Sequence, residues 1–347
     1  MKTAPLVSLA RLESLLAALP KLTIGLVGDL FLDRYLEIDP EMSELSIETG
    51  LEAYQVTRIR NSPGALGTVM NNLAALGVGR LVPVTVLGDD GQAYDLLQEL
   101  DRMPVDASHV IRDPGRLTPT YTKPMRRGEG GVWHELNRID LRNKAALAEK
   151  TQARLCEMLA DVFAATDGLI VLDQVNEEGW GVITPAVRQH LAALAEKHPE
   201  RLMFVDSRAQ IAKFRRGTLK PNVHECLAAL GRKATGAADE PEAAARDFAR
   251  LTGCPLYCTV GERGILVADP REAPVLAPGY PVAGPVDIVG AGDSATAGIV
   301  SALLAGASRL EAAAVGNLVA SITVQQLGTT GTASPVQVRD RWNVVHT

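Results

Sequence analysis

The chain has 347 residues, of which 46% are hydrophobic, and its formal net charge is −6. A chain of this length can bury a sizeable core as one large domain. Because it is acidic and has no block of like charges, it lacks the basic surface that contacts to nucleic-acid phosphates require. We therefore expect one soluble domain over residues 1–347 that binds a small molecule and no nucleic acid.

The N-terminal apolar run from Leu6 to Leu19 is interrupted by Arg11 and Glu13. Since no uninterrupted apolar run approaches the roughly 18 residues of a membrane span, this run predicts an amphipathic helix and no membrane contact. The cysteines form no CxxC pair, which favours buried free thiols over zinc ligands. Together these features predict a cytoplasmic protein.

Along the rest of the chain, apolar strand-like runs alternate with helical patterns. The expected strands are 22–28, 80–87, 168–172, 202–206, 255–260 and 264–268. The expected helices are 68–76, 93–101, 145–164, 185–197, 243–251 and 293–305. This order predicts an α/β fold, in which a mostly parallel sheet is covered by helices on both faces.

Two polar segments, residues 34–61 and 118–140, break this alternation. Both lack a helical period, and the first contains alternating patches such as Glu52 to Ile59, so we expect them to form a small β lid. Lid strands with free edges can pair across a two-fold axis, so a homodimer is the expected assembly.

The most informative local pattern is DIVGAGDSATAG, residues 287–298, in which a small-residue turn and a carboxylate precede an apolar helical run. Successive N–H groups of Gly290, Ala291 and Gly292 can converge on an anion at the N-terminus of that helix. Asp293 would then accept the proton of an attacking hydroxyl. The alternative, from the residues alone, is an ordinary helix start in which Asp293 is the N-cap.

Two other nucleotide-binding patterns are missing from the sequence. The first strand and turn read TIGLVGDLFLD, without GxGxxG spacing, and no GxxxxGK followed by Ser or Thr occurs. The chain is therefore a poor candidate for a Rossmann dehydrogenase or a Walker-type NTPase.

Four further segments precede the GAGD turn, residues 290–293, along the chain. They are GDLFLD (28–33), SPGALGTVMNNLAALG (62–77), KPNVHE (220–225) and TVGERG (259–264). This set resembles the PfkB, or ribokinase-like, family of carbohydrate kinases. The resemblance implies a ribokinase-like fold, with ATP and Mg²⁺ as cofactors.

The resemblance also implies roles for individual residues. Asp293 would be the catalytic base, and Gly290, Ala291 and Gly292 would form the anion hole. The implied nucleotide-side contacts are Asn222, Glu225, Thr259, Gly261, Gly264 and Asn317. Glu225 would organise Mg²⁺ through water, and Asp287 would face a monovalent cation, K⁺.

On the acceptor side, the implied contacts are Asp29, Asp33, Gly64, Thr68 and Arg138. Asp33 matches the family acid that accepts hydrogen bonds from sugar hydroxyls. Ala65 stands where the family has a second glycine, so it adds a methyl group where close backbone approach or a positive φ is expected. Thr68 replaces the usual Asn.

Within the family, GDLFLDRY, LNRID (136–140) and LGTTGTASP (327–335) resemble the heptose-7-phosphate kinase group. The chain departs from relatives at DQVNEEG (173–179), where they often carry DYxKG, and at Val289, where they carry Thr. Glu177 and Glu178 would repel a sugar phosphate if they faced the cleft. The expected function is ATP-dependent phosphorylation of a hydroxyl of a sugar or sugar phosphate, with a heptose-phosphate-like acceptor. These departures keep an alternative open, a non-catalytic ribokinase-like protein that binds nucleotide or sugar.

Overall fold

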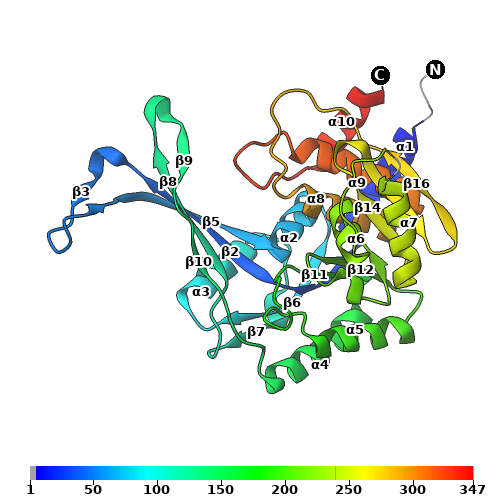
Figure 1. Ribbon diagram of the computed structural model, residues 1–347, viewed down its shortest axis with the longest axis horizontal. Helices are drawn as coiled ribbons and strands as arrows, with labels where there is room; N and C mark the ends of the chain where they lie inside the picture. The colour runs from blue at the N-terminus through cyan, green and yellow to red at the C-terminus, as the bar shows by residue number, and fades with distance from the viewer. Residues whose placement is uncertain (1–4, 239, 347) are drawn as a thin grey trace.

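The computed structural model describes residues 5–238 and 240–346 (Figure 1). Within these residues, a nine-stranded sheet has the order β16-β15-β14-β13-β12-β11-β1-β6-β7. Its strands are β1 (Thr23–Gly28), β6 (Arg80–Gly88), β7 (Val110–Asp113), β11 (Gly168–Asp173), β12 (Leu202–Ser207), β13 (Thr218–Leu219), β14 (Leu256–Thr259), β15 (Gly264–Asp269) and β16 (Glu272–Pro278). Within this sheet, the described neighbours from β7 to β14 pair in parallel, and β14, β15 and β16 pair antiparallel. The predicted mostly parallel sheet is confirmed.

Helices cover both faces of this sheet. They are α1 (Leu9–Ala18), α2 (Leu66–Ala75), α3 (Gly91–Leu100), α4 (Glu149–Ala165), α5 (Pro185–Lys197), α6 (Val223–Ala229), α7 (Glu240–Thr252), α8 (Ala291–Leu304), α9 (Arg309–Thr323) and α10 (Pro335–His346). One hydrophobic core packs α1, α2, α3, α8, α9 and α10 against side chains such as Leu26 and Ile170. A second core packs α4 to α7 against the other face, through side chains such as Val27 and Val171. The alternation of strand side chains between the two cores follows from the two-residue period of a strand.

Local capping explains where several helices begin. Thr184 accepts a hydrogen bond from the Val187 N–H and is followed by Pro185, which is well placed in a first turn. Ser308 and Glu311 form a reciprocal capping box at the start of α9.

No described helix combines the length and apolar character that crossing a bilayer needs.

The two polar segments form a second sheet that projects from the body (Figure 1). Its strands are β2 (Leu30–Ile38), β5 (Val56–Ala65), β8 (Thr120–Arg127), β9 (Trp133–Glu135) and β10 (Ile139–Leu141), and the short strands β3 (Glu44–Leu45) and β4 (Glu52–Ala53) extend its tip. Strand β2 pairs antiparallel with β5 and parallel with β8. Because β2 follows β1 after a single residue, the lid sheet grows directly from the carboxyl edge of the main sheet.

Candidate active site

Helix α8 begins at the GAGD turn. Gly290 is its N-cap and has a φ of 80°, in the left-handed region that favours glycine. Asp293 lies three residues further on, inside the first turn, so the alternative in which Asp293 is the N-cap is wrong. A Cβ built on Gly290 would lie 3.4 Å from Thr330 Cγ2 and 3.6 Å from Thr68 Cγ2. The turn is therefore enclosed by α2 on one side and by the segment before α10 on the other.

A cavity of about 1260 Å³ opens beside this turn, and we call it the large cavity. Residues 290–293 line it together with Lys220, residues 222–225, residues 259–263 and Asn317. The Ala291 N–H donates to the Ile288 carbonyl at 3.1 Å, and the other N–H groups of the first turn of α8 point toward the helix N-terminus, where the helix dipole favours negative charge. The large cavity has the size for a nucleotide and an anion site at its floor.

The carboxyl of Asp293 has a raised pKa. Its pKa is raised from 3.8 to about 7, chiefly because the surrounding protein desolvates the charged form and next because Asp206 is close. Lys220 and Arg208 oppose this rise. Asp293 keeps part of its surface exposed to the large cavity, so a bound hydroxyl can reach it. A base with a pKa near the working pH is well matched to accept a proton.

Lys220 and Asp206 are site residues to which the sequence interpretation gave no role. Lys220 Nζ lies 2.9 Å from Asp206 Oδ2, and the two side chains are only 6% and 10% exposed. A Cβ built on Gly292 would lie 3.6 Å from Lys220 Nζ, so this ammonium group borders the GAGD turn. Burial lowers the pKa of Lys220, but the hydrogen bond to Asp206 and the charges of Asp206, Glu225 and Asp293 together outweigh burial, so the pKa is raised overall. The sequence signal was the lysine two residues before Asn222 in KPNVHE, directly after a strand.

Asn222, Glu225 and Thr259 lie together on one wall of the large cavity. The Asn222 N–H donates to Glu225 Oε2 at 2.7 Å, and the Glu225 N–H donates to Asn222 Oδ1 at 2.8 Å, which caps α6. Asn222 also pairs with Thr259 through an isolated β-bridge. Burial raises the pKa of Glu225. This cap holds one carboxylate in a fixed position beside the cavity.

The remaining expected nucleotide-side residues divide into two groups. Gly261 and Asn317 line the large cavity, as expected, and the Asn317 amide donates to the Ala277 and Pro278 carbonyls. Gly264 does not belong to the cavity lining. Its φ is 110°, and a Cβ there would lie 2.3 Å from the Ala277 oxygen. This glycine permits close pairing of β15 with β16, and its nucleotide contact stays a prediction.

On the acceptor side, Asp33 lies on β2 beside a lysine from β8. Lys123 Nζ is 3.2 Å from Asp33 Oδ1 and donates to the Tyr35 hydroxyl at 3.1 Å. Both charged side chains are about 15% exposed, so water screens the pair only partly. A Cβ on Gly64 of β5 would lie 2.6 Å from Asp33 Oδ2, so a larger residue at Gly64 would displace this carboxylate. Asp33 and Gly64 are thus brought together, and Lys123 orients Asp33.

Ala65 occupies strained backbone next to Gly64. Its φ of 53° and ψ of −114° lie where L-residues are rare, and it is the only described non-glycine residue with a positive φ. The expected positive φ at this family glycine position is confirmed. Thr68, in the first turn of α2, is 3% exposed and lies between this corner and Gly290.

Asp29 anchors the loop after β11. It is 3% exposed, and its two oxygens accept the N–H groups of Gln174, Val175 and Val182 at 2.7–3.1 Å. Burial nevertheless raises its pKa. Asp29 lies in the lining of a second hollow below the lid, and its contact with a sugar stays a prediction.

Two further expected residues have local ion-pair or backbone partners. Arg138 binds Asp140 through two hydrogen bonds of 2.7 and 2.9 Å and lies 4.3 Å from the Tyr121 ring centre. Asp287 accepts the Val289 and Gly328 N–H groups, and so joins the segment before the GAGD turn to LGTTGTASP. Arg138 lies in a second hollow below the lid, whereas Asp287 lies beside the GAGD turn.

The two glutamates of DQVNEEG are each paired with a cation. Glu177 accepts from Arg142 Nη2 at 2.9 Å, and Glu178 binds Arg188 at 2.7 Å and Lys213 at 2.6 Å. Neither lines the large cavity. The expected repulsion of an anionic ligand is therefore reduced by these pairs.

The model of the pfkB family carbohydrate kinases matches residues 35–336. The chain belongs to the PfkB carbohydrate kinase family. This membership favours the expected catalytic function over the non-catalytic alternative.

Curated relatives point to one group within the PfkB family. The chain is 30% identical over 324 residues to the bifunctional protein HldE of Bradyrhizobium sp. (strain ORS 278), covering 93% of this chain and 64% of that protein. It is 32% identical over 331 residues to the bifunctional protein HldE of Caulobacter sp. (strain K31), covering 92% and 63%. The chain thus spans less than two thirds of the length of these relatives.

Solved structures of PfkB-family sugar kinases share the fold. Arabidopsis thaliana ribokinase complexed with ribose and ATP matches with a TM-score of 0.68 at 17% identity, covering 92% of this chain and 98% of that one. Escherichia coli phosphofructokinase-2 in complex with substrates and products matches with a TM-score of 0.69 at 20% identity, covering 94% and 100%. The expected ribokinase-like fold is confirmed.

Proposed function

We propose that this PfkB-family enzyme transfers the γ-phosphoryl group of ATP to a hydroxyl of a sugar or sugar phosphate. The observation that carries the proposal is Asp293, whose pKa is raised to about 7, in the first turn of a helix that begins with Gly290 at a φ of 80°. A base and an anion site meet at one point of the large cavity. That combination suits in-line transfer to an alcohol.

In the proposed reaction, Asp293 accepts the proton of the acceptor hydroxyl while the hydroxyl oxygen forms a bond to the γ-phosphorus. The bond from that phosphorus to the bridging oxygen breaks, and ADP leaves. The N–H groups of residues 290–292 and the Lys220 ammonium stabilise the negative charge on the transferred group. Asp206 keeps Lys220 charged and in position beside the turn.

Magnesium would be held on the wall that carries Asn222 and Glu225. The described residues contain no group of three or more His, Cys, Asp or Glu that could hold a metal. Such a sparse donor set fits Mg²⁺, which keeps several waters and binds mainly through nucleotide phosphates. When bound, the ion would neutralise phosphate charge, and Glu225 would hold its water shell.

The acceptor would lie between Asp33 and Asp293, below the lid sheet. Asp33 would accept hydrogen bonds from two sugar hydroxyls, with Lys123 fixing the carboxylate. A shift of the lid sheet onto the body would exclude water and suppress hydrolysis of ATP. The HldE relatives support a heptose-phosphate-like acceptor.

Two further features belong to the same proposal. Asp287 holds together the two segments that would border a K⁺ site, and a potassium complex is known for Escherichia coli phosphofructokinase-2. The lid strands have open edges and exposed side chains such as Leu45 and Ile59, 71% and 59% exposed, so they would pair in a homodimer.

The experiment that tests the proposal is a transfer assay with radiolabelled ATP, labelled at the γ-phosphate, and a panel of sugars and sugar phosphates. Ligands for the panel are first selected by the thermal shift they cause with Mg·ATP, because binding to the native state raises Tm. We expect labelled product from at least one acceptor. Failure of every stabilising ligand to accept label would contradict the proposal.

A further inference from the structure

A second cavity of about 200 Å³ lies below the lid, and we call it the lid cavity. Its aromatic wall is Phe31 and Tyr121, whose rings meet edge to face at 5.3 Å. It shares Gln174 and Arg208 with the large cavity, so the two hollows adjoin. The lid cavity is too small for a nucleotide and fits one end of a smaller molecule.

The lining of the lid cavity is positively charged, although the chain as a whole carries a net charge of −6. Its charged residues are Arg116, Arg138, Arg142, Arg208, Asp29 and Asp140. Asp29 is already bound to three backbone N–H groups. The cavity therefore has a surplus of positive side chains over negative ones.

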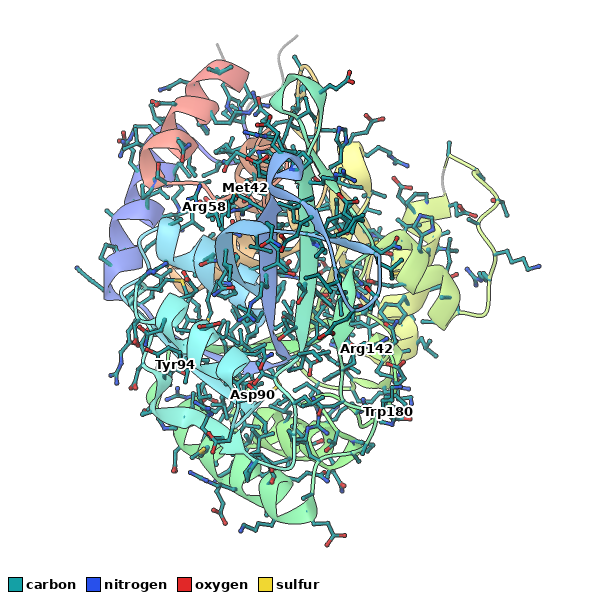
Figure 2. The ribbon with its side chains drawn as sticks, turned by 90° about the vertical axis from the view of Figure 1, so that its left-hand side faces the viewer. Met42, Arg58, Asp90, Tyr94, Arg142 and Trp180 are labelled. Atoms are coloured by element: carbon teal, nitrogen blue, oxygen red, sulfur yellow. The ribbon has the colours of Figure 1, made fainter. Side chains whose placement is uncertain are left out.

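The arginines that face this cavity keep donors free. Glu177 binds Arg142 through Nη2 alone, so Nε and Nη1 of Arg142 are available. Within the described part of the chain, the Arg208 guanidinium has no hydrogen-bond or ion-pair partner. Figure 2 shows Arg142 and Trp180 on the same side of the molecule, below the lid strands, and both line this cavity.

We propose that the lid cavity binds a phosphate group carried by the acceptor, through Arg142, Arg138 and Arg208, with Glu177 as the positioning residue for Arg142. Planar guanidinium groups bind phosphate through paired hydrogen bonds and are the preferred partners for it. The proposal rests on the proposed kinase function, and it makes that acceptor a sugar phosphate monoester. The phosphate would lie at the far end of the sugar from the hydroxyl that faces Asp293.

This arrangement also gives a role to the segment that departs from the family pattern. DQVNEEG lacks the lysine of relatives, but its Glu177 reaches across to the residue that follows β10 and holds Arg142 in place. The positive charge that the loop lacks is supplied here by the lid side of the cavity. The neighbouring Glu178 has no such role, because its partners Arg188 and Lys213 do not line the cavity.

The test measures the affinity of inorganic phosphate by calorimetry, in the presence of excess Mg·AMP-PNP to occupy the large cavity. Arg142→Gln should weaken phosphate binding about tenfold or more, because a charge-assisted pair of hydrogen bonds is lost. Its control is Arg216→Gln, which removes another exposed arginine ion pair, that with Glu196. Equal phosphate affinity in these two variants, or no phosphate binding by the wild type, would overturn the proposal.

Glutamate variants give a second, opposite readout. Glu177→Gln keeps an acceptor for Arg142 but removes the competing charge, so phosphate should bind about twofold to fivefold more tightly. Glu178→Gln makes the same charge change one residue away and should leave the affinity unchanged. If both variants shift the affinity equally, only the general charge matters and the assigned role of Glu177 is wrong.

Two further measurements separate the remaining outcomes. Binding of gluconate tests whether the cavity prefers a carboxylate to a phosphate, and turnover tests the proposed kinase function. If Arg142→Gln weakens gluconate binding but not phosphate binding, the cavity binds a carboxylate and the phosphate assignment is wrong. If the wild type phosphorylates sugars but Arg142→Gln binds phosphate as tightly as the wild type, the lid-cavity proposal is wrong and the proposed kinase function is retained. If phosphate affinity responds as expected but no acceptor is phosphorylated, the proposed kinase function fails and the anion site stands.

Discussion

Asp206 and Lys220 form a buried ion pair, with 2.9 Å between Oδ2 and Nζ, beside the carboxyl of Asp293. The two side chains come from the end of β12 and from the loop before α6, and they meet where the GAGD turn begins α8. Asp206 raises the pKa of Asp293, and Lys220 lowers it. The charges of Asp206 and Lys220 therefore affect both the stability of this buried pair and the pKa of Asp293.

The first prediction concerns the stability of this pair. Lys220→Met leaves Asp206 buried without its partner, and we expect the free energy of unfolding to fall by about 3–5 kcal/mol. The double variant Asp206→Asn/Lys220→Met removes both charges and should recover most of that loss. Urea denaturation of the three proteins measures the difference. A larger loss of stability in the double variant than in Lys220→Met would contradict the ion-pair account.

The second prediction concerns the strained corner of the acceptor site. Ala65→Gly should stabilise the protein by about 1 kcal/mol, because glycine relieves a backbone strain of about 1–3 kcal/mol and loses part of this gain to chain entropy. Ala74→Gly, within α2 at ordinary helical geometry, is the matched control and should destabilise by about 0.5–1 kcal/mol. Thermal or urea unfolding checks both. A destabilising Ala65→Gly would show that the strain is not real.

The third prediction concerns Asp173, whose pKa is raised to about 7, chiefly by burial and next by the charge of Asp29. Between the ordinary value of 3.8 and about 7, the folded state holds a proton that the unfolded state has lost. The stability from this group is therefore full below pH 3.8 and is lost as the pH rises through 7. Asp173→Asn does not titrate, so its stability relative to the wild type should increase from pH 5 to pH 8.

Urea unfolding of wild type and Asp173→Asn at both pH values provides the measurement. The exposed Asp101→Asn controls for the loss of one negative charge. A stability difference that stays constant with pH for Asp173→Asn would mean that its carboxyl titrates alike in both states.

The sequence predicted those elements whose signal is local. The apolar runs of β1, β6 and β11 and the capped helix α5 were identified nearly to the residue. Each of these elements has a clear hydrophobic pattern and is bounded by residues that start or end a strand or helix. Strand β16 was missed because EAPVLAP contains two prolines, which ordinarily argue against a strand. Helix α9 was missed because the consecutive residues from Ala312 to Gly316 are small and give little alternation between hydrophobic and polar positions.

The site was predictable only where residue type and spacing carry the chemistry. The GAGD turn and the capping pair of Asn222 and Glu225 are local motifs, so the sequence indicates them. Lys123 with Asp33, and Arg142 with Glu177, join positions 90 and 35 residues apart, and these contacts depend on how the lid sheet packs. The anchoring role of Asp29 was hidden for the same reason, because its backbone donors follow a different strand.

The central claim is that Asp293 is the base of phosphoryl transfer, and the direct measurement is kcat and kcat/KM as a function of pH for wild type and Asp293→Asn. Wild-type kcat/KM should rise with pH through about 7, as the carboxyl loses its proton. In Asp293→Asn, kcat should fall by about 10² to 10⁴, nucleotide affinity should stay the same, and the step near pH 7 should disappear. A variant that keeps wild-type kcat and its pH dependence would contradict the account.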